Sequence, residues 1–356
     1  MNDRIIRLRA AMEQNGLDAV VLKSVTAIRY FSGFTSVDAS VLITKTRSLL
    51  LTDFRYTIQA KAQSGDCCEI LEVSGAAHNA ALETAIKEEN VQRLGFEEDY
   101  LSYAGYQAFA AFGAEMVPFA KELHKLRIVK TEEEIACLQK AQSMADAAFA
   151  ELLTVVHAGM TEKRVAAELE YICAKLGSEG PSFETIIGSG PNGAMCHAVP
   201  GDRKLQEGDL VVVDFGCLYN GYHSDMTRTF AVGKVDPFAE EIYGIVREAQ
   251  QRALDALKPG ITGKELDAIA RDYIKEKGYG ECFGHSLGHG FGLLIHEAPW
   301  ASTAGDIVFE EGMTITVEPG IYIEDKFGVR IEDCCVVTKD GKLDLVTSTK
   351  ELMHVD

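Results

Sequence analysis

The stretch that decides the fold is DLVVVDFGCLYNGYHSDMTRTF, residues 209–230. Two runs rich in β-branched and aromatic residues flank an Asn-Gly pair at 220–221, the dipeptide most typical of a two-residue hairpin turn. With this turn, Asp214 pairs with Thr227, and Asp225 becomes the diagonal neighbour of Asp214. Because side chains alternate between the faces of a strand, the two carboxylates emerge on one face, within about 7–8 Å of each other.

Asp214 follows three consecutive valines, 211–213, which we expect to be buried. A carboxylate beside such a run is costly unless a cation or good hydrogen-bond donors hold it. Two aspartates on one rigid face therefore make the beginning of a metal site.

Composition excludes several classes of function. The chain has 356 residues, enough for two domains, with 47% apolar and 25% charged residues. Its formal net charge is −19, from 35 basic and 54 acidic residues. Nucleic acids and anionic membranes both require basic patches, so neither is expected as a partner.

The cysteines and the N-terminal segment bear on location. Nine cysteines at irregular spacing, with no C-x-x-C, indicate reduced thiols in a cytoplasmic protein rather than a disulfide framework. The segment MNDRIIRLRAAMEQNG is typical of an amphipathic helix and not of a signal peptide. No apolar stretch approaches the roughly 20 residues that a membrane span needs.

Residues 1–125 alternate short apolar runs with helical patterns, which predicts an α/β domain. The first helix is expected from Asp3 to Gln14, with Gly16 as its C-cap. Strands are expected at 18–23, 39–45, 48–53, 69–73 and 91–97, and further helices at 54–64, 78–90 and 102–112. No G-x-G-x-x-G follows the first strand, which argues against a dinucleotide site. We interpret His78 and His124 as surface histidines rather than ligands.

Residues 126–356 form the second predicted domain. Thr131-x-x-Glu134 is a capping box that opens a long helix. Helices are expected at 132–157, 162–177, 238–257 and 263–277, the second of them capped by Thr161, with strands and glycine-rich loops between and after the two pairs. This order, two helices then a hairpin, two helices then strands, hints at an internal two-fold repeat.

Three further segments carry candidate chemical groups: FGHSLGHGFGLLIHEAP (283–299), TITVEPGIYI (314–323) and GVRIEDCCVV (328–337). Arg330 and Glu332 are two apart on a predicted strand, so they face the same side. Each segment alone has an ordinary structural explanation: a glutamate at a strand end is usually solvated, and a histidine on a glycine-rich loop is usually a hydrogen-bonded surface group.

Together these segments point to metal chemistry. Asp214, Asp225, Glu318 and Glu332 all lie at apolar strands or their ends, where an uncompensated charge is costly. Four carboxylates with one imidazole suit two divalent ions, manganese or cobalt ahead of zinc or iron, and do not suit a cysteine-based structural zinc. Four negative charges also balance two doubly charged ions. The chemistry indicated is metal-assisted hydrolysis.

With these residues in hand, the sequence resembles the pita-bread metallopeptidases, which include aminopeptidase P, prolidase and methionine aminopeptidase. The motifs that carry the resemblance are VVVDFG, HSDMTRTF, GHSLGHGFGLLIHEAP, TVEPGIY and VRIED. The likeness covers nearly the whole chain. Residues 1–125 look like the creatinase-type N-terminal α/β domain, and residues 126–356 like the α+β pita-bread catalytic domain with its pseudo-two-fold repeat.

The resemblance implies five metal ligands: Asp214, Asp225, His289, Glu318 and Glu332. It places Asp214 on one ion, His289 and Glu318 on the other, and Asp225 and Glu332 as bridges. It also implies that three histidines hold substrate carbonyl oxygens: His197, His285 and His296.

By the same resemblance, Glu318 moves a proton from the attacking water to the leaving nitrogen, and Arg330 fixes a ligand carboxylate. His223 has no place in the family's ligand set, so we interpret it as structural. We interpret Cys196 and Cys217 as small buried hydrophobic residues.

The large N-terminal domain and His197 favour the branch of the family that cleaves Xaa-Pro bonds. Trp300 stands where prolidases often have an arginine for a dipeptide's carboxylate, which favours an Xaa-Pro aminopeptidase acting on short peptides with proline second. The alternatives are an Xaa-Pro dipeptidase (prolidase), a metal-independent hydrolase like creatinase, or a non-catalytic peptide-binding member; the intact ligands disfavour the last two. The family also implies a homodimer.

Overall fold

The computed structural model describes residues 3–75 and 77–356 and separates the chain into two compact units, Met1–Arg127 and Ile128–Asp356. The sequence had placed the division at 125/126. Helix α6 (Ala120–Ile128) spans the division point. Within the described ranges, none of the helices combines the length and apolarity that crossing a bilayer requires.

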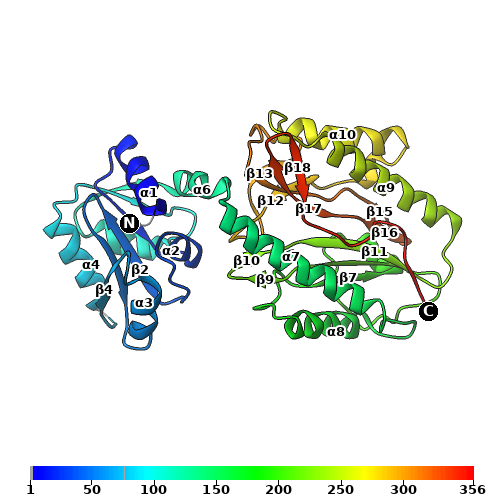
Figure 1. Ribbon diagram of the computed structural model, residues 1–356, viewed down its shortest axis with the longest axis horizontal. Helices are drawn as coiled ribbons and strands as arrows, with labels where there is room; N and C mark the ends of the chain where they lie inside the picture. Colours follow the sequence, from blue (N-terminus) through cyan, green and yellow to red (C-terminus); the bar gives the residue numbers. More distant parts are fainter. Residues whose placement is uncertain (1–2, 76) are drawn as a thin grey trace. The chain divides into compact units, whose positions relative to one another are not determined.

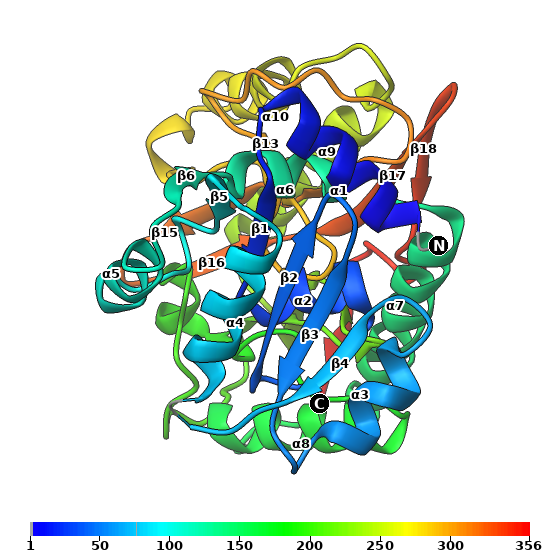
Figure 2. The same ribbon diagram turned by 90° about the vertical axis from the view of Figure 1, so that its left-hand side faces the viewer.

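Among its described residues, the N-terminal unit forms a mixed six-stranded sheet in the order β4-β3-β2-β1-β5-β6. Figure 2 shows β2, β3 and β4 side by side. The strands are β1 (Ala19–Leu22), β2 (Ala39–Thr44), β3 (Ser48–Thr52), β4 (Glu69–Glu72), β5 (Arg93–Phe96) and β6 (Glu115–Pro118). The other helices are α1 (Asp3–Gln14), α2 (Val25–Ser32), α3 (Thr57–Ser64), α4 (Ala77–Glu88) and α5 (Tyr103–Ala110).

The predicted α/β pattern is confirmed, but two elements were missed, α2 and β6. The side chain of Ser24 caps α2 by accepting a hydrogen bond from Ala27 N, and Gly33 ends the helix at φ 79°. Of the two histidines interpreted as surface groups, His124 is exposed beside Asp99. His78 is instead half-buried, with Nε2 2.7 Å from Ser40 Oγ.

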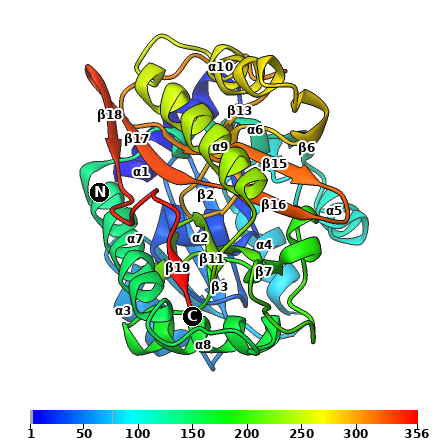
Figure 3. The same ribbon diagram turned by 90° about the vertical axis from the view of Figure 1, so that its right-hand side faces the viewer.

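The second unit holds two helix pairs, α7 (Glu132–Leu152) with α8 (Glu162–Lys175), and α9 (Pro237–Ala256) with α10 (Gly263–Glu276). The capping box that opens α7 is confirmed, although the helix ends at 152 rather than 157. In Figures 1 and 3, α10 lies at the top of this unit and α8 at the bottom, with the strands between them.

The strands of this unit form small sheets. One four-stranded sheet has the order β19-β11-β8-β7, and a three-stranded sheet has the order β14-β17-β18. Three pairs complete the set, β9 with β10, β12 with β13 and β15 with β16. The bounds are β7 (Ile186–Ser189), β8 (Leu210–Phe215), β9 (Leu218–Tyr219), β10 (Tyr222–His223), β11 (Met226–Val232), β12 (Gly288–Gly290), β13 (Glu297–Ala301), β14 (Thr314–Val317), β15 (Gly320–Ile323), β16 (Phe327–Arg330), β17 (Asp333–Thr338), β18 (Gly341–Asp344) and β19 (His354–Val355).

The hairpin at 209–230 has the predicted register. Asp214 on β8 pairs with Thr227 on β11. The tip continues through β9 and β10, and the turn residues Asn220 and Gly221 have φ of 47° and 67°. Two positive φ values at the central positions are the signature of a type I′ turn, so the dipeptide sets the register.

The internal repeat is visible in the backbone hydrogen bonds. In each half, a threonine caps the second helix, Thr161 for α8 and Thr262 for α10. Each threonine also forms an isolated β-bridge with a later residue, Thr161 with Lys204 and Thr262 with Val308. In the turn between α7 and α8, Gly159 N donates to Leu205 O (2.8 Å). In the turn between α9 and α10, Gly260 N donates to Phe309 O (2.9 Å). The two halves therefore use the same construction.

Candidate active site

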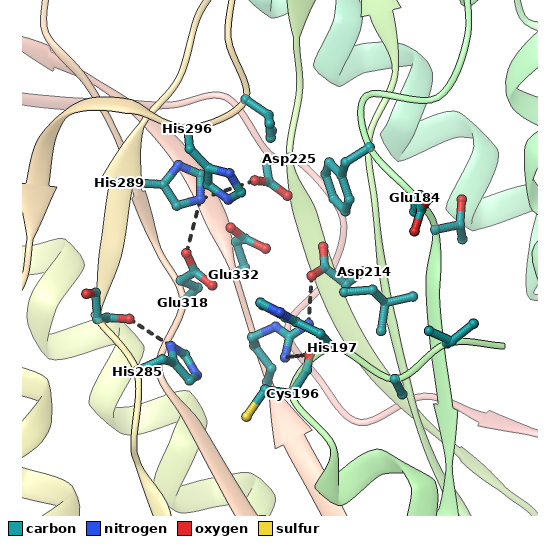
Figure 4. Close-up of a pocket in the computed structure, with 18 of the residues that line it drawn as sticks. Glu184, Cys196, His197, Asp214, Asp225, His285, His289, His296, Glu318 and Glu332 are labelled. Atoms are coloured by element: carbon teal, nitrogen blue, oxygen red, sulfur yellow. Dashed lines mark hydrogen bonds and ion pairs between the residues drawn. The ribbon is translucent and has the colours of Figure 1, made fainter. Parts of the chain in front are cut away.

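A cavity of about 520 Å³ opens in the second unit (Figure 4). The residues that the sequence selected line this single cavity: His197, Asp214, Asp225, His285, His289, His296, Glu318, Arg330 and Glu332. Asp214 and Asp225 come from the first half of the repeat, and His289, Glu318 and Glu332 come from the second. The folding of both halves is thus needed to assemble the group.

Polar contacts join the hairpin to the last strands. Arg330, at the end of β16, donates from Nη2 to Asp214 Oδ2 (2.6 Å) and from Nε to Thr227 Oγ1 (3.1 Å). The Thr227 hydroxyl donates to Glu332 Oε2 (2.7 Å). Arg330 and Glu332 therefore face the same side, as the alternation predicted, and Arg330 is positioned to hold Asp214.

His289 is carried on β12 between two glycines that bring the backbone close to its neighbours. A Cβ at Gly288 would lie 1.9 Å from Thr316 O, and one at Gly290 would lie 2.4 Å from Ala298 O, so neither position admits a side chain. His289 Nδ1 lies 3.1 Å from Gly290 O, which makes that nitrogen the donor. The Nε2 lone pair then faces the carboxylates.

The contacts of His289 Nε2 are 3.3 Å to Glu318 Oε1 and 3.5 Å to Asp225 Oδ2. Burial, together with the neighbouring His296, lowers the pKa of His289 to about 3, so the imidazole is neutral at neutral pH. A lone pair that faces two carboxyl groups is a repulsive arrangement unless a proton or a cation lies between them. The geometry therefore suits a ligand set better than an ion pair.

Two further observations fit divalent cations. Ligand atoms of Asp225, His289 and Glu332 all lie within 4.8 Å of one another, and the three residues are buried. Asp214 Oδ1 and Glu332 Oε1 are buried without a hydrogen-bond partner among the described residues. Buried acceptors without donors are rare in folded proteins. Among the described residues of this site, the cation Arg330 already donates to the other oxygen of Asp214, so it does not satisfy these two atoms.

The carboxyl groups also resist ionisation in the protein alone. Burial raises the pKa of Glu318 to about 8, with Asp214 adding to the effect. Burial and the neighbouring carboxylates raise the pKa of Asp225 and of Glu332 well above the usual values. Oxygen-rich ligands with one imidazole suit manganese, cobalt, iron or zinc, and the donor set therefore fits the ions that the sequence indicated.

The three outer histidines differ in their freedom. His285 Nδ1 lies 2.8 Å from Ser286 O and must donate to it, which leaves Nε2, 2.9 Å from the Tyr322 hydroxyl, to accept. Burial lowers the pKa of His285 to about 4, so both nitrogens are engaged in the neutral ring. His197 and His296, by contrast, make no hydrogen bond to another described residue and face the cavity.

His296 is held by aromatic packing. Its ring lies 4.3 Å from that of His289 and is nearly parallel to the indole of Trp300, at a centroid distance of 6.4 Å. Trp300 is 44% exposed and forms part of the cavity wall. The residue that stands in place of the family's arginine therefore presents an apolar surface beside His296.

Sequence reasoning missed Tyr322. Its hydroxyl accepts from Arg330 Nη1 (2.7 Å) and, as described above, donates to His285. The strand register contains the signal, because Gly320 pairs with Arg330, which makes Tyr322 the diagonal neighbour of Arg330 on the same face.

The remaining site residues behave as expected in most respects. Half-buried His223 lies 2.9 Å from Ser182 Oγ through Nδ1, which is the contact of a structural histidine. Cys217 is fully buried, whereas Cys196 is only half-buried and lines the cavity. All nine cysteines lie within the described ranges and carry free thiols.

Comparison with known proteins agrees with this site. Residues 136–339 match the model of metallopeptidase family M24, and residues 4–129 match the creatinase/prolidase N-terminal domain. The Xaa-Pro dipeptidase of Pyrococcus furiosus is 40% identical over 357 residues, covering 99% of this chain and 100% of its own.

Solved structures give the same result. The Xaa-Pro dipeptidase from Bacillus anthracis superimposes with a TM-score of 0.96 at 44% identity, covering 99% of both chains. The X-Pro aminopeptidase from Thermotoga maritima superimposes with a TM-score of 0.91 at 38% identity, covering 97% of this chain and 100% of that one. The creatinase-type and pita-bread folds are thereby confirmed, and this chain belongs to metallopeptidase family M24.

Proposed function

We propose that the protein is an Xaa-Pro dipeptidase, which hydrolyses the single peptide bond of dipeptides that end in proline. The observation that carries the proposal is the convergence of Asp214, Asp225, His289, Glu318 and Glu332 in one cavity. The sequence had favoured the aminopeptidase because of Trp300. The relatives named Xaa-Pro dipeptidase, alike over the whole chain, favour the alternative instead.

The same five residues would hold two divalent ions, with manganese or cobalt expected. Bound there, the ions would supply Lewis acidity, which would lower the pKa of the attacking water and polarise the substrate carbonyl. Arg330 keeps Asp214 in place through its 2.6 Å contact. Because an outer partner of this kind fixes a ligand's orientation, its loss typically costs about 10–100-fold in metal affinity or activity.

Proton transfer falls to Glu318. Its Oε1 accepts a hydrogen bond from Thr316 Oγ1 (3.0 Å), which orients the carboxyl group. We assign it the role of taking a proton from the attacking water and delivering it to the proline nitrogen as the bond breaks. His197 and His296, whose ring nitrogens face the cavity, would donate to the carbonyl oxygen as negative charge develops on it.

The aminopeptidase remains the second candidate, because Trp300 offers no charge to a dipeptide's carboxylate and one 38%-identical structure is an X-Pro aminopeptidase. Kinetics on Xaa-Pro and on Xaa-Pro-Xaa, with the manganese-loaded protein, separate the two. Faster hydrolysis of the dipeptide supports the proposal, and hydrolysis of the tripeptide alone would replace it by the aminopeptidase.

Controls address the remaining alternatives. Activity that survives a chelator would indicate a metal-independent hydrolase. If metal is bound, as measured by elemental analysis, and neither peptide is cleaved, the chain is a binding member of the fold. The homodimer and the cytoplasmic location stay predictions, and analytical ultracentrifugation tests the first.

A further inference from the structure

We propose that two buried carboxylates outside the metal site, Glu162 on α8 and Asp267 on α10, position the loops that carry His197 and His285. Each half of the repeat thus contributes one positioning residue for one cavity histidine. The inference rests on the proposed function, because it matters for catalysis only if these histidines act in hydrolysis.

Glu162 is the first residue of α8 and is fully buried. Its Oε1 accepts hydrogen bonds from Ser189 N (2.9 Å), Ser189 Oγ (2.6 Å) and Asn192 Nδ2 (3.0 Å). Its Oε2 accepts from Gly201 N (3.0 Å) and also from Asn192 Nδ2 (3.1 Å). One side chain therefore ties together the two ends of the loop 189–201.

The middle of this loop is anchored from the opposite side. Arg330 Nη1 donates to Cys196 O (3.1 Å), and a Cβ at Gly328 would lie 1.9 Å from Gly193 O, so the loop packs directly on β16. His197 follows the anchored Cys196 and makes no polar contact with a described residue. Its position is therefore set by the backbone anchors on either side, and Glu162 supplies two of them, at Ser189 N and Gly201 N.

Asp267 does the same in the second half. It is 1% exposed, and its Oδ1 accepts from Leu287 N (3.0 Å). Asp267 also forms a bidentate pair with Arg271, whose Nε donates to Asp267 Oδ2 (2.7 Å) and whose Nη2 donates to Asp267 Oδ1 (2.8 Å). Arg271 in turn donates to His285 O (2.7 Å) and to Phe283 O (2.9 Å). The chain on both sides of His285 is thus fixed to α10.

The fixed backbone matters because His285 takes part in a longer chain of contacts. Its Nε2 accepts from Tyr322, whose hydroxyl accepts from Arg330, which holds the candidate ligand Asp214. A shift of His285 would therefore reach the candidate ligand Asp214 through three hydrogen bonds. In the first half, by contrast, His197 itself faces the cavity.

Amide variants test the proposal without changing side-chain size. Glu162→Gln and Asp267→Asn each replace one accepting carboxylate oxygen with an NH₂ group, which cannot accept a hydrogen bond. Each variant therefore loses the hydrogen bonds that this oxygen accepted from the loop or its partner. We expect hydrogen exchange to quicken at backbone amides within 190–200 for Glu162→Gln, and within 283–287 for Asp267→Asn. Unchanged exchange in the matching loop would overturn the proposal whether or not the protein proves to be a peptidase.

Double-mutant cycles separate positioning from general stability. Glu162→Gln should lower kcat about 10–100-fold, the usual size for partners that orient a catalytic group, and have little further effect once His197 is alanine. The effects of Glu162→Gln and His285→Ala on kcat should instead be additive. Asp267→Asn should have little further effect once His285 is alanine and should be additive with His197→Ala. Equal losses in every background would show that the two carboxylates serve stability alone.

The chain provides matched controls. Thr161→Ala removes the cap of the same helix without touching the loop, so it should lower the melting temperature and leave kcat unchanged. Should an amide variant fail to fold, Ser189→Ala removes the hydroxyl that donates to Glu162, and Arg271→Lys removes the bidentate pair with Asp267. Both variants carry the same expectation. Wild-type protein that binds manganese but cleaves neither peptide would refute the proposed function, while the exchange result would still decide the positioning.

Discussion

Glu332 and Asp333 are neighbours in the chain and are both buried, yet the protein treats their charges in opposite ways. Asp333 meets Arg228 Nη2 at 2.8 Å and Gln250 Nε2 at 2.9 Å, and it also pairs with Lys350. Burial raises the pKa of Asp333, but Arg228 and Lys350 more than offset this and hold it below the usual value. Glu332, on the other face, keeps one oxygen without a partner and a raised pKa.

The difference shows how to separate structural charges from functional ones. The Asp333 cluster brings its own cations, so it is complete when the chain folds. Among the described residues, the Glu332 cluster contains four carboxylates and only Arg330 as a fixed cation, so it leaves like charges close together in a buried site. Such groups cluster at functional sites, where a ligand from outside completes them.

Breaking the complete cluster should have the largest effect on stability. Arg228 also donates to the carbonyl oxygens of Glu332 and Ser348, and its side chain is fully buried. Arg228→Met leaves Asp333 partly uncompensated, and we expect a loss of about 3–5 kcal/mol in the free energy of unfolding, measured by urea denaturation.

The matched control is Arg252→Met, which breaks the exposed pair with Glu248 and should cost at most about 1 kcal/mol. Similar losses for the two variants would remove the contrast between buried and exposed pairs.

Breaking the incomplete cluster should have the opposite pattern, with activity lost and stability kept. Asp225→Asn removes a charge from a crowded site, so the metal-free protein should be at least as stable as the wild type. Peptidase activity should fall by more than about 100-fold, beyond the usual cost of an outer-shell change.

The stabilisation of the protein by bound manganese also tests whether Asp225 is a metal ligand. At 100 times its Kd, a bound ion stabilises a protein by about 2.7 kcal/mol, which thermal melts with and without manganese would detect. That increment should be absent in Asp225→Asn. An undiminished increment would exclude Asp225 from the ligand set.

The smallest expected effect concerns the edge of the complete cluster, at Asp344. Burial and the charge of Asp333 raise the pKa of Asp344 to about 6. The folded state therefore favours the protonated acid, so stability is lost as the pH rises from about 4 through 6. Asp344→Asn should stabilise the protein at pH 7–8 by roughly 1 kcal/mol after discounting its partial exposure, and the gain should vanish towards pH 4. A gain independent of pH, in denaturation series at both values, would contradict this origin.

Much of this site could be predicted because local rules determine it. The Asn220-Gly221 turn leaves one register open, and that register brings Asp214 and Asp225 to one face. The threonine caps at 131 and 161 were predicted for the same reason, since a cap depends on residues three or four apart.

What the sequence did not reveal depends on distant partners. Nothing in the sequence marks Arg228, whose guanidinium is buried among chain segments more than a hundred residues away. From the sequence, Glu162 is simply an acidic residue in the first turn of a helix. Its role in holding the loop 189–201 becomes visible only in the folded structure. The short helix α2 was missed because its first residues, Val25 and Thr26, favour strands, and only the Ser24 cap and tertiary packing decide otherwise.

The size of the cavity has a consequence for what can reach the chemistry. A volume of about 520 Å³ equals roughly 17 water molecules at the density of the liquid. A few residues of extended peptide fit in that space, and a folded domain does not. Under the proposed function, the substrates are therefore short peptides, which other peptidases release from longer chains.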